Sequence, residues 1–463
     1  MSRGLDLRIS SPSQVICALV ESLVVVGSFV LAMAIRFGAD LTDQDLVPAR
    51  ALASAVVIAL TLYYNDLYED FALRRRREML LRIVKSFAVA TLLLSLVYYV
   101  VPALSVGRGV LGIHLALALA GVLAWRLVFM WAVGQRALAD RVLILGTGHS
   151  AQQVAREMLR RRPLGFDVVG FLGEHRAEVG RPLVNPSVIG TADDLEALVA
   201  QRRVNLIVVA LDDRRGKLPM ATLLRCRLAG VRVEEATNFF ERLTGKILVS
   251  NLRPSWLVFS QGFNKPRLLR NSKRAAELLV ALALLVLAAP LMLLIAALIK
   301  LSDGGSVFYR QERVGEKGRT YSLFKFRTMR LNAEVDTGPV WAAEANDPRV
   351  TFLGRILRKT RLDELPQLLN VARGEMSFVG PRPERPHFVG VLRKVIPYYD
   401  ERHSVRPGIT GWAQIKFRYG STIEDAEEKL QFDLYYIKHM SFLFDLGIIL
   451  DTFKVMLRHK GAR

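Results

Sequence analysis

The stretch "LLVALALLVLAAPLMLLIAALI", residues 278–299, contains no charged side chain. A helix of this length can cross the ~30 Å hydrocarbon core of a bilayer. Pro290 lies near its middle, where the proline ring opposes the carbonyl of Val286 and interrupts the helical hydrogen bonds. Each half, about 11 residues, rises about 17 Å, which is roughly one leaflet. The stretch predicts a membrane helix over about residues 275–300 that is broken at Pro290.

Basic residues flank this stretch on both sides, and their distribution predicts its topology. They are Lys265, Arg267, Arg270, Lys273 and Arg274 before it, and Lys300, Arg310, Arg313 and Lys317 after it. Because basic flanks stay on the cytoplasmic side, both ends of the helix are expected there. We therefore expect a re-entrant helix that enters and leaves by one face, with an ordinary span as the alternative.

Residues 1–136 contain four more apolar stretches, at 15–35, 51–64, 86–104 and 110–133. Most of them approach the ~20 residues that a spanning helix needs. The connection between the second and third is the most basic, and residues 74–77 are all arginine. The positive-inside rule then places both ends of this segment in the cytoplasm. We predict a transmembrane bundle of four helices over 1–136, the alternative being the core of a soluble helical domain.

Composition limits the partners. The chain of 463 residues carries a net charge of +21, and 51% of its residues are hydrophobic. Such a charge suits nucleic acid, anionic lipid headgroups or phosphorylated substrates. Nucleic acid is disfavoured because the basic residues cluster at membrane flanks without interleaved aromatic residues. The two cysteines, Cys17 and Cys226, provide neither a disulfide framework nor a cysteine-based metal site.

The segment 139–262 has the pattern of a Rossmann-like domain. In "RVLILGTGHSA", residues 141–151, a strand-like run enters a glycine turn and then a helical stretch. Gly146, Gly148 and Ala151 match the dinucleotide fingerprint and are candidate nucleotide-binding positions. Asp167 and Glu174 are candidates for the ribose-binding acid. The alternative is a regulatory or oligomerisation domain that kept the fold without the ligand.

Hydride chemistry lacks its catalytic pair in this domain. Tyr321 and Lys325 have the Tyr-x-x-x-Lys spacing of short-chain dehydrogenases, but they lie far downstream. They also lie in an alternating, strand-like stretch, whereas that dyad requires a helix. We therefore do not interpret them as that dyad.

The stretch "TRLDELPQLLN", residues 360–370, places Asp363 and Glu364 side by side just before Pro366. Proline is tolerated in the first turn of a helix, so the two acids are expected at a helix start, where anions, including phosphate, are favoured. Neighbouring helical side chains point about 100° apart, so one carboxylate can face phosphorus while the other faces a metal ion. The alternative for two such acids is compensation of the helix dipole.

Several motifs occur in order around this pair: "FYRQERVG" at 308–315, "YSLFKFRTM" at 321–329, "GRILRKTRLDELPQLLNV" at 354–371, "MSFVGPRPERP" at 376–386 and "VRPGITGWAQ" at 405–414. Together they resemble the bacterial sugar transferase family, the polyprenyl-phosphate hexose-1-phosphate transferases, over residues 264–463. With the membrane segment and the Rossmann-like domain, the whole chain resembles the large, WbaP-like branch associated with exopolysaccharide or O-antigen assembly. The implied fold is an α/β phosphoglycosyl transferase domain that carries the re-entrant helix.

The resemblance implies transfer of hexose-1-phosphate from a UDP-hexose to undecaprenyl phosphate, with release of UMP. It implies Asp363 as the nucleophile, which forms a covalent sugar-phosphate intermediate, and Glu364 as a ligand of Mg²⁺. Lys325, Arg358 and Arg382 are the implied phosphate-binding cations, and arginine forks match phosphate oxygens. For each cation the alternative is a solvated surface position. A ternary complex with Asp363 as general base would use the same residues.

The expected location is the bacterial inner membrane, with the Rossmann-like and catalytic domains on the cytoplasmic side. A homodimer is compatible with this branch, and the identity of the hexose stays open. The competing hypotheses are a membrane-anchored nucleotide-sugar-modifying enzyme that uses the Rossmann-like domain, and a non-catalytic assembly scaffold. Trp412 is expected to pack inside the domain rather than to bind sugar or nucleotide. The apolar segment 442–457 contains Asp445, Asp451 and Lys454, so we expect an interfacial or core-facing helix.

Overall fold

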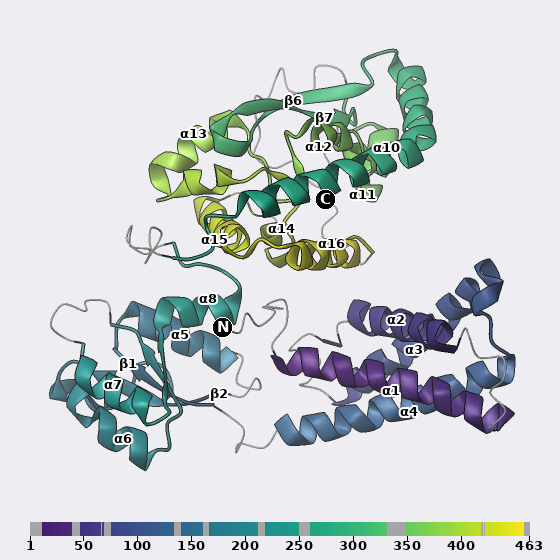
Figure 1. The fold of residues 1–463 in the computed structure, drawn as a ribbon. Helices are drawn as coiled ribbons and strands as arrows, with labels where there is room; N and C mark the ends of the chain where they lie inside the picture. The colour runs from purple at the N-terminus through teal and green to yellow at the C-terminus, as the bar shows by residue number, and fades with distance from the viewer. Residues whose placement is uncertain are drawn as a thin grey trace. The chain divides into compact units, whose positions relative to one another are not determined.

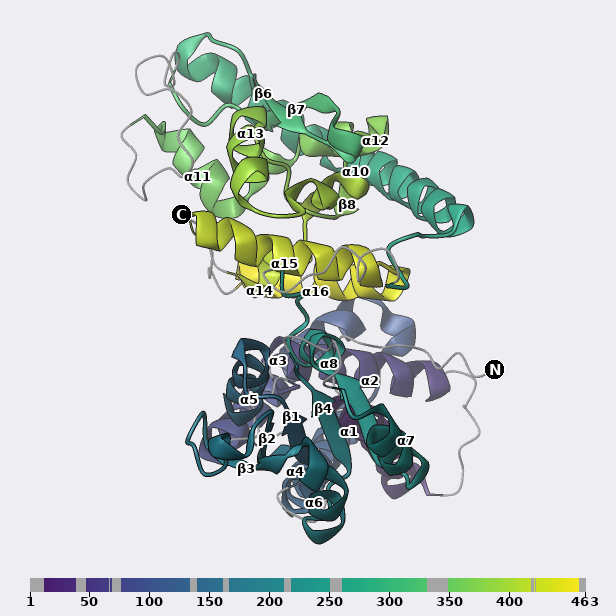
Figure 2. The ribbon, with the colours of Figure 1, turned by 90° about the vertical axis from the view of Figure 1, so that its left-hand side faces the viewer.

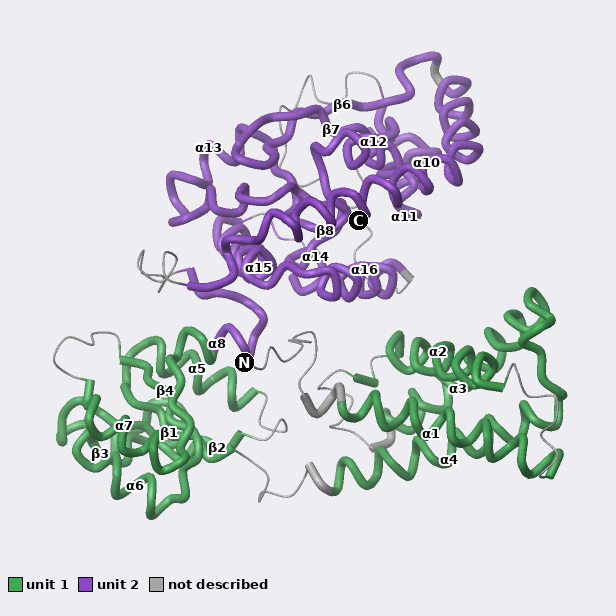
Figure 3. Tube along the Cα trace, viewed as in Figure 1, with its two compact units in different colours: residues 1–239 green, residues 240–463 purple. Residues whose placement is uncertain are grey.

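The computed structural model describes residues 12–38, 47–65, 67–68, 76–133, 140–160, 166–211, 218–249, 260–330, 349–417, 420 and 422–457. The chain divides into two compact units, Met1–Phe239 and Phe240–Arg463 (Figure 3). The domain limits expected from the sequence, at 1–136, 139–262 and 264–463, stay predictions.

The first unit begins with four long helices that lie side by side (Figure 1). They are α1 (Pro12–Phe37), α2 (Val47–Tyr64), α3 (Arg76–Val100) and α4 (Arg108–Val133), with the short turn η2 (Pro102–Leu104) between the last two. Ile58, Ile83 and Val122 meet in the apolar core between them. Large apolar side chains such as Leu23 and Leu92 are more than two-thirds exposed on the outer faces. Such a surface suits lipid rather than water.

An ion pair that the sequence pattern did not predict lies inside these helices. Glu21 of α1 and Arg126 of α4 are almost completely buried and form a two-pronged ion pair. Arg126 also donates to the carbonyl oxygen of Leu67 at 2.8 Å, and the Tyr68 hydroxyl donates to Glu21 at 2.7 Å. A buried charge requires such a counter-charge and hydrogen bonds. The cluster therefore links α1, α4 and the chain just after α2.

The second part of this unit is a five-stranded parallel sheet in the order β3-β2-β1-β4-β5. The strands are β1 (Asp140–Leu145), β2 (Phe166–Gly173), β3 (Val188–Thr191), β4 (Leu206–Val209) and β5 (Arg232–Glu235). The helices are α5 (His149–Arg160), α6 (Leu195–Gln201) and α7 (Met220–Leu228), with the turns η5 (Arg176–Glu178) and η6 (Ala192–Asp194). Helix α8 (Ala236–Thr244) contains the boundary between the two units. Helices α5 and α7 lie on opposite sides of the sheet (Figure 2). The parallel α/β domain predicted from the sequence is confirmed.

The second unit builds a small α/β domain around a long helix. Its helices are α10 (Arg267–Asp303), α11 (Phe352–Thr360), α12 (Gln367–Arg373), α13 (Pro386–Val395), α14 (Trp412–Lys416), α15 (Ile423–His439) and α16 (Phe442–Leu457). The strands are β6 (Phe308–Val314), β7 (Thr320–Phe326), β8 (Ser377–Val379) and β9 (Gly408–Thr410), and the short turns are η7 (Glu316–Gly318), η8 (Leu362–Glu364) and η9 (Tyr399–Ser404). Strands β6 and β7 form an antiparallel pair, and β8 and β9 a parallel pair.

Helix α10 contains Pro290 and is visibly bent (Figure 1). It continues through the proline as one helix of 37 residues, longer than the predicted 275–300 and bent rather than interrupted. Ala281 in its first half packs against Val371 and Met376, and Ile299 in its second half packs against Phe326. Most other apolar side chains near the bend are exposed.

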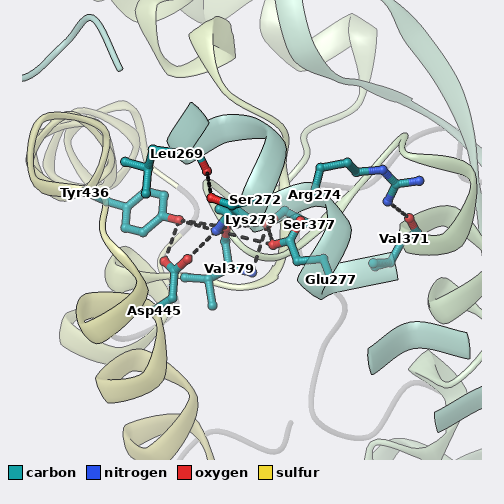
Figure 4. Close-up of polar contacts among 10 residues, drawn as sticks. All are labelled: Leu269, Ser272, Lys273, Arg274, Glu277, Val371, Ser377, Val379, Tyr436 and Asp445. Atoms are coloured by element: carbon teal, nitrogen blue, oxygen red, sulfur yellow. Dashed lines mark hydrogen bonds and ion pairs between the residues drawn. The ribbon is translucent and has the colours of Figure 1, made fainter. Parts of the chain in front are cut away.

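Polar contacts anchor the first half of α10 to the rest of this unit (Figure 4). The Lys273 ammonium pairs with Asp445 of α16 and lies 3.2 Å from the Tyr436 hydroxyl of α15. Glu277 accepts a hydrogen bond from the Ser377 hydroxyl of β8. These contacts join the base of the long helix to α15, α16 and β8.

The described ranges contain five helices that are long and apolar enough to cross a membrane: α1, α2, α3, α4 and α10. Helix α16 has the expected bounds 442–457 but is not among these five within the described chain. Asp445 and Lys454 of α16 are buried, whereas Phe442 and Phe453 are about half exposed. One face of α16 therefore belongs to the core.

Candidate active site

Asp363 and Glu364 lie in the turn η8, between α11 and α12. Arg361 ends α11 in the left-handed region with φ of 60°, which redirects the chain into this turn. The acids were expected inside a helix start. They instead occupy a 3₁₀ turn, and α12 begins three residues later at Gln367, with Pro366 as its cap. This short turn aims the two adjacent carboxylates at different surroundings.

Asp363 is buried, with 7% of its surface exposed. Within the described part of the chain, its Oδ1 atom has no hydrogen-bond partner. Burial raises the pKa of this carboxyl, and Lys325 opposes the rise only in part. A buried carboxylate oxygen without a donor costs free energy unless a ligand or a metal ion satisfies it. Such an atom is suited to reaction with a bound substrate.

Glu364 faces three cations. Its Oε1 atom lies 2.9 Å from Lys325 Nζ, 3.8 Å from Arg361 Nη1 and 3.9 Å from Arg382 Nη2. Burial alone would raise the pKa of Glu364, but Lys325, Arg382 and Arg361 lower it to about 2. Glu364 is therefore ionised at neutral pH.

The structure brings two of the three predicted cations, Lys325 and Arg382, directly to the dyad. Arg358, on α11, donates from Nε to the Thr328 hydroxyl at 2.9 Å, and its charge lowers the pKa of Asp363. Arg361, the third cation at Glu364, was not among the predicted phosphate-binding residues. Its spacing of three residues was a usable signal, because i and i+3 side chains meet on a helical turn.

The loop that carries Arg382 is held at two successive carbonyl groups. Arg313 of β6 donates to the carbonyl oxygen of Pro383 at 2.8 Å, and Arg402 of η9 donates to that of Arg382 at 3.0 Å. Arg402 is buried and lies 2.9 Å from Asp433 of α15. Because both arginines are themselves anchored, the loop has a fixed backbone from which Arg382 reaches Glu364.

Divalent metal binding is compatible with this donor set. Among the described residues, no group of three or more His, Cys, Asp or Glu side chains could hold a metal ion. Mg²⁺, however, is usually held by one or two carboxylates together with substrate phosphates rather than by an all-protein cage. The adjacent carboxylates and the unsatisfied Asp363 oxygen fit that requirement.

The glycine turn of the sheet domain has a structural explanation. Gly146 has a φ of 122°, and a Cβ atom there would lie 2.5 Å from the carbonyl oxygen of Ala210. The Thr147 hydroxyl donates to the Glu178 carboxylate at 3.3 Å, so an acidic group already lies beside the turn. A carboxylate at this position would repel the negatively charged pyrophosphate of a dinucleotide. Nucleotide binding at Gly146, Gly148 and Ala151 stays a prediction.

The two candidate ribose-binding acids lie near opposite ends of β2. Glu174 directly follows the carboxyl end of the strand, and its role stays a prediction. Asp167 lies at the amino end of β2, 3.9 Å from Arg141, whereas ligands of such sheets bind at the carboxyl ends of the strands. The backbone N–H of Glu174 donates to Glu178. Asp167 is therefore on the wrong edge, because the sequence pattern located the strand but not its ends.

Trp412 belongs to an aromatic cluster in the second unit. It is buried, stacks on Tyr435, meets Phe444 edge to face, and donates from Nε1 to the carbonyl oxygen of Gly245 at 2.8 Å. The structure supports the expected packing role. Tyr321 and Lys325 both lie on β7, in agreement with the strand expected there.

Candidate membrane helices, a parallel α/β domain and a carboxylate pair faced by cations together describe a membrane protein whose site suits phosphorylated substrates. Residues 268–459 match the bacterial sugar transferase family. Residues 64–224, which include α3, α4 and most of the sheet domain, match a family described as a CoA-binding domain. The chain belongs to the bacterial sugar transferase family, which confirms the family predicted from the motifs.

Individual relatives agree with this assignment. The chain is 40% identical to a UDP-N-acetylgalactosamine-undecaprenyl-phosphate N-acetylgalactosaminephosphotransferase of Aeromonas hydrophila, over 52% of this chain and 56% of that protein. It is 32% identical to a UDP-glucose:undecaprenyl-phosphate glucose-1-phosphate transferase of Xanthomonas campestris pv. campestris, over 70% of this chain and 68% of that protein. It is 40% identical to the exopolysaccharide production protein PSS of Rhizobium leguminosarum bv. phaseoli, over 39% of this chain and 92% of that protein. The chain thus spans only about half of the Aeromonas protein.

Proposed function

We propose that this protein transfers hexose-1-phosphate from a UDP-hexose to undecaprenyl phosphate, releasing UMP and forming undecaprenyl-diphospho-hexose. The single observation that carries the proposal is the site itself, in which a buried carboxylate with an unsatisfied oxygen adjoins a second carboxylate held by three cations. The names of the relatives support the two substrates. They include a glucose-1-phosphate transferase and an N-acetylgalactosaminephosphotransferase, so the hexose stays open.

In the proposed mechanism, Asp363 attacks the phosphorus that bears the sugar. The new bond joins the Asp363 carboxylate to this phosphorus, and the bond to the bridging oxygen breaks, so that UMP leaves with that oxygen. A phosphate oxygen of undecaprenyl phosphate then attacks the same phosphorus. The bond to Asp363 breaks, and the free carboxylate returns.

The surrounding residues would stabilise the charge of this transfer. Lys325, Arg361 and Arg382 lie around Glu364, and their charges would stabilise the diphosphate of the substrate. Glu364 would hold Mg²⁺, which when bound neutralises non-bridging phosphate oxygens. A site closed by burial strengthens each of these electrostatic interactions.

We also propose a membrane arrangement that brings this site to both substrates. Helices α1 to α4 would span the bacterial inner membrane as a bundle with both ends on the cytoplasmic side. Helix α10 would enter and leave by that face, because its bend at Pro290 and its basic flanks favour a hairpin over a crossing. The sheet domain and the catalytic unit would then be cytoplasmic. Homodimer formation stays a prediction.

A nucleotide-sugar-modifying enzyme is disfavoured by the position of its candidate residues. Tyr321 and Lys325 lie on β7 of the second unit, outside the parallel sheet that would bind the cofactor. Lys325 is already engaged by Glu364 at 2.9 Å. Neither residue is placed for hydride chemistry.

The test is UMP release by the purified chain in nanodiscs, with Mg²⁺, undecaprenyl phosphate and a panel of UDP-sugars. We expect release with one sugar or a few, dependent on the lipid phosphate, and a loss of about a hundredfold or more in Asp363→Asn and Glu364→Gln. Glu424→Gln, an exposed carboxylate of α15, is the matched control and should retain activity. Well-folded protein that releases no UMP from any sugar would refute the proposal and favour the scaffold. Full activity of Asp363→Asn would refute the covalent mechanism alone.

A further inference from the structure

Asn370, the last residue of the stretch 360–370, is completely buried in α12. Its side-chain oxygen accepts a hydrogen bond from the Phe324 backbone N–H at 3.1 Å. Its side-chain nitrogen donates to the Ser322 carbonyl oxygen at 2.7 Å and to the Glu375 carboxylate at 2.7 Å. Every partner fixes the orientation of the amide, because a backbone N–H can only donate and a carbonyl can only accept.

This amide completes one edge of strand β7. On the other edge, β7 pairs with β6, and Leu323 lies opposite Gln311. The groups bound by Asn370 are the carbonyl before Leu323 and the N–H after it, the two groups that a residue opposite Leu323 would bind in a parallel third strand. Asn370 therefore replaces a strand with a single side chain. Without it, the buried N–H of Phe324 and the carbonyl of Ser322 would lose these partners.

Lys325 follows Phe324 in β7, and its ammonium lies 2.9 Å from Glu364. Glu364 and Asn370 belong to one short segment, so the amide joins the strand that carries the cation to the segment that carries the acids. We propose that Asn370 is a positioning residue, which fixes β7 so that Lys325 stays against Glu364 and beside Asp363. This inference rests on the proposed function, because it assigns a role in the same reaction.

The neighbouring residue supplies the contrast. Val371 is equally buried and packs against Leu323 of the same strand, together with Ala281 and Met376. An apolar side chain is thus sufficient to pack α12 on β7 at the adjacent position. A buried amide with three hydrogen bonds does more, because hydrogen bonds set the position of the strand along its length as well as its distance.

The first test measures the hydrogen bonds between Asn370 and β7, called the clamp below, without relying on activity. Hydrogen–deuterium exchange of a β7 peptide is compared in nanodiscs for the wild type, Asn370→Leu and Val371→Ala. In Asn370→Leu the Phe324 amide should exchange about tenfold faster, as expected when one hydrogen bond is lost. The exchange in Val371→Ala should stay close to the wild type. Equal exchange in Asn370→Leu and the wild type would refute the clamp. Asn370→Ala, which introduces no larger side chain, replaces Asn370→Leu if the latter does not fold.

The second test measures the positioning role through kcat for UMP release in a double-mutant cycle with Lys325→Met. Asn370→Leu should lower kcat in the wild type but have little further effect in the Lys325→Met background, because Asn370 acts through Lys325. Val371→Ala should have the same small effect in both backgrounds. Equal losses from Asn370→Leu in both backgrounds would overturn the positioning role. A wild type without UMP release would refute the proposed function, whereas the exchange measurement would still decide the clamp.

Discussion

Asp363 and Glu364 are neighbours in the chain but lie in opposite electrostatic environments. Burial raises the pKa of Asp363, whereas Lys325, Arg382 and Arg361 outweigh burial at Glu364 and hold its pKa at about 2. Two carboxyl groups whose environments separate their pKa values are suited to different roles in one reaction. Glu364 is a permanent anion, and Asp363 is the group whose ionisation depends on the site.

The pH dependence of kcat should therefore follow Asp363. A nucleophilic carboxylate must be ionised, so kcat should fall as the pH falls through the raised pKa of Asp363, while Glu364 stays ionised over the same range. Lys325 lowers the pKa of Asp363, so Lys325→Met should move the acid limb to higher pH as well as lower kcat. The measurement is UMP release under saturating substrates across the acidic to neutral range. An acid limb that does not move in Lys325→Met would contradict this assignment.

The Arg402–Asp433 pair should be essential to the second unit. Both side chains are at least 95% buried, and removing one partner of such a pair typically costs about 3–5 kcal/mol because the other charge stays buried. Asp433→Asn should therefore lower the unfolding temperature strongly, and the remaining folded protein should lose activity through the Arg382 loop. Thermal unfolding in detergent and UMP release per folded molecule measure the two effects.

The control for this prediction is a surface pair in the same unit. Arg393 and Asp400 lie 3.0 Å apart and are about half exposed. Exposed pairs contribute only about 0–1 kcal/mol, so Asp400→Asn should change neither quantity appreciably. Equal effects of Asp433→Asn and Asp400→Asn would contradict the prediction that the buried pair is essential to the second unit.

The sequence was sufficient for features that depend on local pattern. Hydropathy located the five long apolar helices, alternation located β7, and the ordered motifs located the dyad with Lys325 and Arg382. Contacts between distant segments could not be predicted. The partners of Asn370 are backbone groups, which leave no signature in a single sequence.

Two errors have a similar physical origin. Asp167 was a candidate for the ribose site because the sequence shows an acid near a strand but not at which end of the strand it lies. The dyad was expected at the start of a helix, but the left-handed Arg361 ends α11 and the two acids lie in a 3₁₀ turn just before α12. Arginine rarely adopts the left-handed conformation, so Arg361 did not indicate a turn in the sequence.

Glu21 and Arg126 should stabilise the first four helices as a pair. Either Glu21→Gln or Arg126→Met alone should cost about 3–5 kcal/mol, because each leaves an unpaired buried charge. The double variant should be closer to the wild type than the sum of the two single variants. Unfolding in detergent checks this. The control is Arg50→Met, a partly exposed cation that contacts the carbonyl oxygen of Ala103. Strict additivity of the two single changes would contradict direct coupling.

The path of α10 can be tested by cysteine labelling, because the chain has only two cysteines and both are buried. In a background without Cys17 and Cys226, single cysteines replace Asn271, in α10 before its apolar stretch, and Arg319, after the helix. Both positions are exposed. The re-entrant path predicts that a membrane-impermeant maleimide labels neither position in intact cells and labels both after permeabilisation. Ser105→Cys, between α3 and α4, is the control expected to react in intact cells.

Pro290→Leu then tests the cause of the bend. Leucine restores the hydrogen bond to Val286 and removes the clash of the proline ring, so a straighter helix becomes favourable. The apolar stretch of α10 is long enough to cross the membrane. In the Pro290→Leu variant, the Arg319→Cys position should therefore become partly reactive in intact cells, while Asn271→Cys stays protected. Labelling of Arg319→Cys in intact cells without the Pro290 change would instead establish an ordinary span and place the catalytic unit on the opposite side from its nucleotide substrate.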